Sequence, residues 1–179
     1  FHPMTTLFFR LAVDQLQQRS GVKIIEDVLS RKAGQTIREG WNIPPTSLFQ
    51  TEMDVNDPLL QDFLGYEQQA TGGTATAYSA VAEKYRHDLT GDQRHVLLAA
   101  LLADKMGLKA KDRDETHTLF AHLTGLRPHV IQNEVEDLRQ EYGVLEWNER
   151  FRRYDIISDA IPRSAFNRFL EKRVRSIPA

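Results

Sequence analysis

Cysteine is absent from this sequence. The absence excludes a disulfide framework, a thiolate metal site and a thiol nucleophile, and it agrees with a cytosolic protein. No run of about 18 apolar residues occurs, so no membrane-spanning helix is predicted. The formal net charge is only −2 over 179 residues, which gives no overall electrostatic case for binding nucleic acid or membrane. Because the sequence starts at Phe1 without a signal peptide, we expect a piece of a longer protein.

The motifs of common catalytic classes are also missing. The glycine-rich stretch 71–74 is followed by no lysine before Lys84, so a plain turn is favoured over a phosphate-binding loop. The sequence has no His-Glu-x-x-His, and His117 and His122 do not share a helical face, so no metal site is predicted. It also lacks a Gly-x-Ser-x-Gly nucleophile motif. We therefore predict no cofactor and no catalytic activity for the chain itself.

Apolar residues at helical spacing dominate what is present, so the predicted fold class is mainly α. Helices are predicted over residues 4–16, 22–29, 58–69, 74–87, 93–106, from Asp112 or Asp114 onward, over 128–142, and over 163–174, where Phe166 would pack. In the second helix, Val22, Ile25 and Leu29 would form the apolar face. In the fifth, that face would comprise Val96, Leu97, Ala100, Leu101 and Ala103. The turn at 90–92 predicts a boundary between a helical domain over 1–90 and a second domain over 91–179.

The second domain is organised around residues 123–157. The helix over 128–142 is predicted to end at Gly143 in a left-handed cap. Two short strands, 144–147 and 151–157, would then form a hairpin joined by a polar turn at 148–150. Helices followed by a two-stranded ribbon are typical of a winged helix; the alternative is a helical bundle with an incidental hairpin. The predicted core of this domain comprises Leu97, Leu101, Phe120, Leu123, Ile131, Val135, Leu138 and Tyr154.

Charge is unevenly distributed over this domain. The helix over 128–142 has four acidic residues against Arg139, a net charge of −3, which is unfavourable beside phosphate unless the acids point away. Residues 148–179 contain eight basic and four acidic residues, a net charge of +4. The predicted contacts with double-stranded DNA are therefore Arg150, Arg152 and Arg153 of the wing, Arg168 and Lys172 of the last helix, and Gln132 and Asn133 as base readers. The alternatives are that the arginines are solvated or that the module binds protein.

Two stretches resemble parts of a known family. The start of the chain resembles the segment after the P-loop core in large bacterial ATPases of the AAA+/STAND kind, some of them from BREX-type phage-resistance systems. The residues that resemble it are Phe1-His2-Pro3-Met4-Thr5, the apolar helix that follows, and then Gln18-Arg19-Ser20-Gly21. In that family a helical lid begins at such a turn and is commonly followed by a winged helix, which residues 154–173 resemble. The resemblance implies that Arg19 is a sensor arginine for the γ-phosphate. The alternative interpretation is that Arg19 is a surface residue in a turn. Walker A and B motifs are absent and would lie upstream.

These observations predict a non-catalytic lid and winged helix from a nucleotide-driven, DNA-associated ATPase in the cytoplasm. One alternative is a winged-helix DNA-binding regulator or initiator. Another is a protein–protein interaction module of a multiprotein complex.

Overall fold

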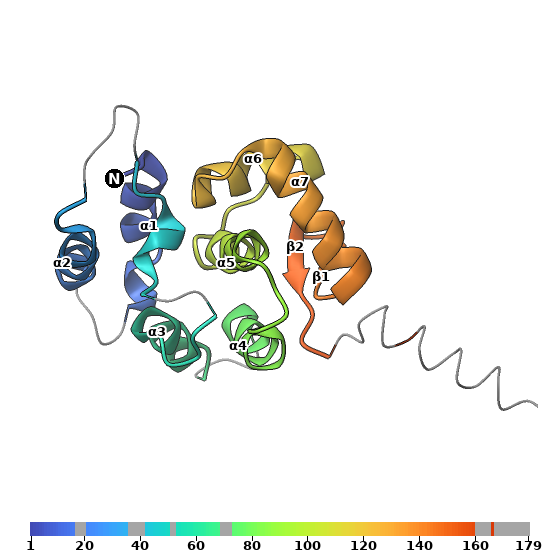
Figure 1. Cartoon of the computed structure of the whole chain (residues 1–179), viewed down its shortest axis with the longest axis horizontal. Helices are drawn as coiled ribbons and strands as arrows, with labels where there is room; N and C mark the ends of the chain where they lie inside the picture. The colour runs from blue at the N-terminus through green and yellow to red at the C-terminus, as the bar shows by residue number, and fades with distance from the viewer. Residues whose placement is uncertain (17–20, 36–41, 51–52, 69–72, 160–165, 167–179) are drawn as a thin grey trace, which may run out of the picture.

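Helix α5 (Gly91–Lys105) lies in the middle of the molecule, with the other elements around it (Figure 1). The structure, a computed structural model, describes residues 1–16, 21–35, 42–50, 53–68, 73–159 and 166. The elements packed against α5 include η2 (Pro45–Leu48), α4 (Thr74–Tyr85), α6 (Arg113–Thr124), α7 (Pro128–Asp137) and β2 (Arg153–Ile156). The remaining helical elements of the N-terminal half are α1 (Pro3–Leu11), η1 (Val13–Gln15), α2 (Gly21–Lys32) and α3 (Pro58–Glu67).

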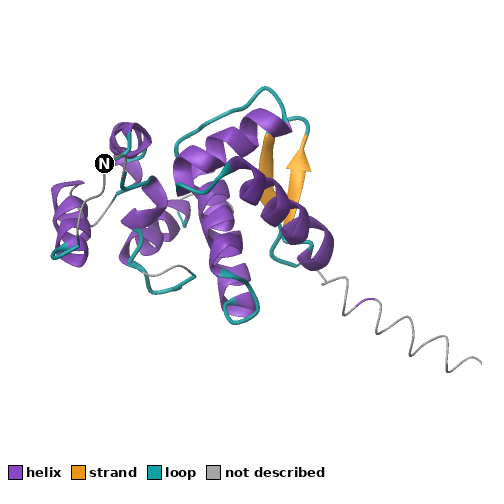
Figure 2. Cartoon of the chain, turned by 45° about the horizontal axis from the view of Figure 1, so that its top comes forward, coloured by secondary structure: helices purple, strands orange, loops and turns teal. Residues whose placement is uncertain are grey.

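The predicted class, mainly α with a winged-helix-like hairpin, is confirmed. Helices α5, α6 and α7 are followed by the strands β1 (Leu145–Asn148) and β2, which pair antiparallel (Figure 2). The hairpin lies beside α7 and contacts α5 through β2. This order of three helices and a ribbon places α7 where a winged helix has its recognition helix.

Local capping signals set most helix limits. Asp57 caps α3 by accepting from the Leu59 and Leu60 N–H groups, and Asp112 caps α6 by accepting from Glu115 N–H. Thr90 and Gln93 form a capping box at the start of α5. Ser, Thr, Asp and Asn satisfy the free N–H groups of a helix start, so the limits at Asp57 and Asp112 were readable from the sequence. Helix α5 begins at Gly91, two residues before the predicted start, because Thr90 caps it.

Helix α5 differs from the single apolar face predicted for it. Every residue from Val96 to Ala103 is buried, including Leu98, Ala99 and Leu102. A helix that is apolar on all sides must be covered on all sides. The buried core is accordingly continuous from α4 and η2 through α5 to α6, α7 and the hairpin. The proposed domain boundary at 90–91 stays a prediction.

The predicted inward face of α2 was wrong. Ile24 and Val28 are buried, whereas Val22 and Leu29 are 66% and 52% exposed. Both sets of residues have helical spacing, so periodicity alone does not choose between them. The first helix also ends earlier than predicted, at Leu11, and a separate 3₁₀ turn follows.

The end of α7 is wider than predicted. Residues Leu138–Tyr142 form a π-helical turn, labelled η3, rather than a last α-helical turn. The Leu138 carbonyl accepts from the N–H groups of Gly143 and Val144. Gly143 has φ 68°, the left-handed cap predicted for it. The turn leads the chain directly into β1.

The register of the hairpin pairs Leu145 with Ile156 and Trp147 with Tyr154 on its inner face. All eight predicted core residues of this half are buried, which confirms that prediction. The connecting turn, however, covers residues 149–152, so β2 begins at Arg153 and not at residue 151. The side chain of Asn148 stabilises this longer turn by accepting hydrogen bonds from the N–H groups of Arg150 and Phe151. Phe166, the one described residue of the predicted last helix, is helical but 49% exposed instead of packed.

Candidate nucleic-acid interface

The tip of the wing, residues 149–152, has a fixed backbone. Asn148 Oδ1 accepts hydrogen bonds from the N–H groups of Arg150 and Phe151, each 3.1 Å long. Asn148 Nδ2 in turn donates to Asp155 Oδ2 at 2.6 Å. Arg152 then takes the left-handed conformation, with φ 51°, which brings the chain back into β2. The polar residue at the end of β1 therefore determines how the tip presents its side chains.

Phe151 projects from this tip between basic side chains. It is 47% exposed. The guanidinium carbons of Arg150 and Arg153 each lie 5.4 Å from the centroid of its ring, within the range of a cation–π interaction. Arg150 and Arg152 are exposed, whereas Arg153 is half-buried. The tip thus combines two exposed positive charges and the exposed carboxylate of Glu149 with one exposed aromatic ring.

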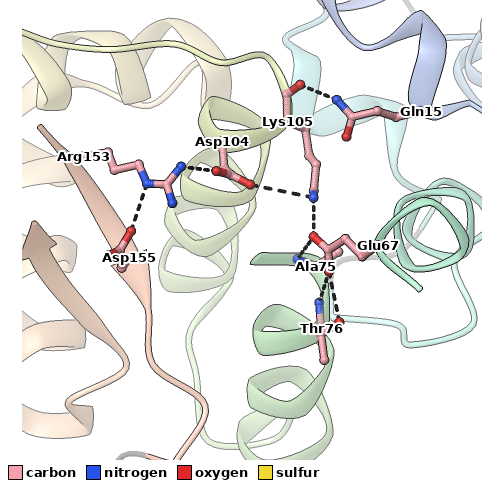
Figure 3. A network of polar contacts seen from close by, with 8 residues as sticks. All are labelled: Gln15, Glu67, Ala75, Thr76, Asp104, Lys105, Arg153 and Asp155. Atoms are coloured by element: carbon pink, nitrogen blue, oxygen red, sulfur yellow. Dashed lines mark hydrogen bonds and ion pairs between the residues drawn. The ribbon is translucent and has the colours of Figure 1, made fainter. Parts of the chain in front are cut away.

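Arg153 differs from its neighbours because two carboxylates hold it. Its Nη1 donates to Asp104 of α5, and its Nε donates to Asp155 at 2.9 Å (Figure 3). A phosphate at this guanidinium would have to compete with both carboxylates. Arg153 therefore anchors the wing to α5 in this structure, a role that its place in the basic cluster does not indicate.

The anchoring network continues through the core to the N-terminal half. Lys105 Nζ forms an ion pair with Glu67 of α3, and both side chains are only 6% exposed. Glu67 also accepts from Ala75 N–H at 2.8 Å and from the N–H and hydroxyl groups of Thr76 at 2.9 and 3.0 Å, at the start of α4 (Figure 3). Burial acts to raise the pKa of Glu67, but the bonds from Lys105, Ala75 and Thr76 lower it overall, so the carboxylate is charged.

A polar groove lies between α6 and α7. It has a volume of about 320 Å³, and its lining residues are Arg113, Asp114, His117, Gln132, Asn133, Val135, Glu136, Arg139 and Tyr154. Gln132 and Asn133, which are consecutive on α7, are both exposed and both line this groove. Arg113 connects the groove to the wing, because its guanidinium lies 5.8 Å from the Trp147 ring centroid and 3.8 Å from Glu149 Oε1.

His117 and Tyr154 form the floor of this groove as a hydrogen-bonded pair. Their rings are nearly parallel, at 7°, with centroids 5.9 Å apart, and His117 Nε2 is 3.0 Å from the Tyr154 hydroxyl. Burial lowers the pKa of His117, although the Asp114 carboxylate opposes that shift. Burial raises the pKa of Tyr154, because it disfavours the charged form of each group. At neutral pH both groups are therefore uncharged, and the groove offers hydrogen bonds without adding net charge.

The acidic residues of α7 and η3 mostly lie away from this groove. Of the four, only Glu136 lines it, and Arg139 Nη1 donates to Glu136 at 3.0 Å. Glu134 is part-buried and accepts from Gln93, and burial raises its pKa, as do the negative charges of Asp137 and Asp92. The negative charges of Asp88, Asp137 and Glu141 help to raise the pKa of Tyr142. The Tyr142 hydroxyl donates a hydrogen bond to the Asp88 carbonyl. Arg139 thus neutralises the acidic residue that lines the groove, Glu136. Asp137 and Glu141 form a separate acidic edge outside the groove.

The predicted DNA-contacting residues that the structure describes therefore fall into three groups. Arg150 and Arg152 are exposed at the wing tip, Gln132 and Asn133 line the groove, and Arg153 is held by carboxylates. The sensor candidate Arg19 lies outside the described residues. So do Arg168 and Lys172 of the predicted last helix.

Sequence reasoning missed Phe151, Arg113 and His117 as parts of this surface. Phe151 lies in the turn before β2, where Arg152 is left-handed, so the alternation of the strand does not extend to it and does not indicate its exposure. The pairing of His117 with Tyr154 joins residues distant in sequence, and no local pattern indicates it. Arg113 follows a helix cap and resembles any exposed arginine.

Other kinds of site are not found in the described part of the chain. Its His, Asp and Glu side chains form no group of three or more that could hold a metal ion. None of the described helices is long and apolar enough to cross a membrane. A scan against known protein families, a search of curated proteins and a search of solved structures each found no match for this chain.

Proposed function

We propose that this chain is a non-catalytic, winged-helix-bearing part of a larger nucleotide-driven ATPase, and that it contacts duplex DNA through its wing. The observation that carries the proposal is the wing tip, where Arg150 and Arg152 are exposed on a turn fixed by Asn148. Two exposed cations on a fixed turn suit the phosphate backbone, which supplies most of the affinity in non-specific binding. Such binding weakens steeply with salt and depends little on base sequence.

The groove supports a secondary contact with bases. Gln132 and Asn133 are exposed on α7, the helix that corresponds in order to a recognition helix, and amide side chains pair with adenine edges. Asp137 and Glu141 do not line the groove, and Glu136, which does, is paired with Arg139, which weakens the electrostatic objection to this helix. Phosphate contacts position the protein in this account, and any base contact is secondary to them.

The ATPase part of the proposal rests on the start of the chain. His2 caps α1, with Nδ1 accepting from Met4 N–H, and Pro3 occupies the first helical turn, as the resemblance implies for a lid that opens at Phe-His-Pro. Arg19 as a sensor arginine, a cytoplasmic location and a role in phage defence belong to this same proposal. The complete reading frame of the gene tests it, because a Walker A motif must lie upstream of Phe1. A complete frame without that motif favours the regulator or initiator.

The wing is tested by measuring duplex affinity at about 50 mM and about 200 mM salt, a range over which phosphate contacts lose most of their strength. We compare the parent chain with Arg150→Ala/Arg152→Ala, leaving Arg153 in place because it anchors the fold. The matched control, Arg10→Ala/Arg86→Ala, removes the same charge at exposed positions on α1 and after α4. The wing variant should lower the log–log salt slope by about two, and the control should leave it nearly unchanged. Equal effects of both variants would refute a wing contact.

A protein-interaction module is the second candidate, and a specific surface favours it. Asp88, Asp137 and Glu141 are all exposed and lie near Tyr142, so together they form an acidic surface suited to a basic partner. Burial, together with these charges, raises the pKa of the Tyr142 hydroxyl. If the parent chain binds no duplex at low salt, this candidate takes first place.

A further inference from the structure

The wing tip contains an exposed aromatic ring that phosphate binding does not explain. Of the aromatic side chains in the described residues, Phe151 is the exposed one with arginine guanidinium groups against its ring. Single exposed apolar residues are common on protein surfaces and need no function. Phe151 differs because it lies in the turn of the hairpin and because both that turn and the adjacent cation, Arg153, are held in place.

The ring is preorganised on two sides. The Asn148 side chain bonds to the Phe151 N–H group and fixes the backbone from which the ring projects. Arg153, whose guanidinium lies 5.4 Å from the ring centroid, is itself held by Asp104 and Asp155. A ring held ready in this way loses little conformational freedom when it binds, so more of the contact energy appears as affinity.

Arg150 is the replaceable neighbour of the ring. It is exposed, its guanidinium also lies 5.4 Å from the ring centroid, and no ion pair within the described residues holds it. A flat ligand that stacks on Phe151 can take the place of this guanidinium. Arg150 is then released beside the ligand, where a phosphate would meet it.

A nucleic-acid base with its phosphate matches this arrangement. Aromatic side chains stack on bases of any sequence, and arginine adds both phosphate contact and cation–π stacking. Within a continuous duplex both faces of a base are already stacked, so a ring at a hairpin tip must either wedge into a step or meet a base at an end. A base that is already unpaired requires no unstacking, which makes it the cheaper partner.

We infer that Phe151 stacks on an unpaired base, so that the chain prefers a junction between duplex and single strand to a continuous duplex. The inference rests on the proposed function and adds the class of nucleic acid that the wing recognises. In this arrangement Arg150 and Arg152 bind phosphates of the duplex, and the Phe151 ring stacks on the base where the duplex ends.

The test compares binding of the same duplex with and without an unpaired extension. A stacking contribution of about 1–3 kcal/mol per base corresponds to a preference of about 5-fold to about 140-fold for the junction in the parent chain. Phe151→Leu keeps the apolar character without the aromatic face and should abolish the preference. Phe151→Trp should keep it. The salt slope should be the same in all three proteins, because no charge changes. A fluorescent base analogue at the first unpaired position should be quenched by the parent and not by Phe151→Leu.

The outcomes separate this inference from the function on which it rests. If Phe151→Leu keeps the junction preference, or if the parent shows none, the inference is overturned while salt-dependent duplex binding still supports the wing contact. In that case Phe151 does not stack on a base, and contact with another protein becomes the alternative role for its ring. If the parent binds neither DNA, both proposals fail. Thermal unfolding of each variant checks that the exposed substitution has not altered the fold.

Discussion

Replacing Lys105 by Met should destabilise the protein by about 3 kcal/mol. Lys105 and Glu67 are each only 6% exposed and form an ion pair between α5 and α3. The variant preserves the length and apolar stem of the side chain but leaves the Glu67 carboxylate without its cation. Removing one partner of a buried pair typically costs about 3–5 kcal/mol, because an uncompensated charge stays buried.

The lower end of that range applies here because Glu67 keeps other donors. The N–H groups of Ala75 and Thr76 and the Thr76 hydroxyl still bind it at 2.8–3.0 Å. The pKa of Glu67 is lowered overall in the folded protein, because these bonds and Lys105 outweigh the effect of burial. A lowered carboxyl pKa contributes stability above its unfolded value of 4.5, and that stability is lost as the pH falls through the folded pKa. The difference between parent and variant should therefore shrink in acid.

Urea unfolding at neutral and acidic pH measures this difference. The matched control is Lys109→Met, an exposed lysine close in sequence, which should change stability by less than about 0.5 kcal/mol. A loss for Lys105→Met no larger than that of the control, or a loss that grows in acid, would refute the account of the network.

Three further predictions follow from burial and charge. Leu138→Ala should cost about 2–5 kcal/mol in urea unfolding because Leu138 is fully buried, and a loss below about 0.5 kcal/mol would show that the buried face of α7 and η3 is assigned wrongly. Glu134→Gln should stabilise the protein at neutral pH, because burial and the neighbouring charges of Asp137 and Asp92 raise the Glu134 pKa. A raised carboxyl pKa lowers stability as pH rises from 4.5 through the folded value, so unfolding midpoints should differ more at neutral pH than in acid, and the reverse would contradict this. The purified chain should not hydrolyse ATP, because it lacks a phosphate-loop lysine, and steady-state turnover abolished by a substitution within the chain would disprove this.

Much of the fold was predictable because local chemistry determines it. Asp57, Thr90 and Asp112 cap helices, and Gly125 and Gly143 end them in left-handed conformations, each at a position that its residue type indicates. The alternation from Leu145 onward likewise predicted the hairpin. These features depend on neighbours within a few residues, so a single sequence contains the information.

What sequence reasoning missed depends on contacts between distant residues. The phase of α2 follows from which side meets the rest of the molecule, and Ile24 and Val22 fit a helical pattern equally well. Arg153 was grouped with its exposed neighbours, but Asp104, far away in sequence, binds it. The groove arises in the same way, from α6 and α7 packing beside β2, so its lining residues could not be assembled from spacing alone.

The central claim, that the wing contacts DNA, is tested most directly by following backbone amide signals of the nitrogen-15-labelled chain as duplex is added at low salt. The largest changes should occur at residues 149–153 of the wing, with smaller changes at Gln132 and Asn133. Signals of the acidic edge, at Asp137 and Glu141, should stay in place because these carboxylates repel phosphate. Changes centred on that edge, or none at the wing while duplex binds, would contradict the account.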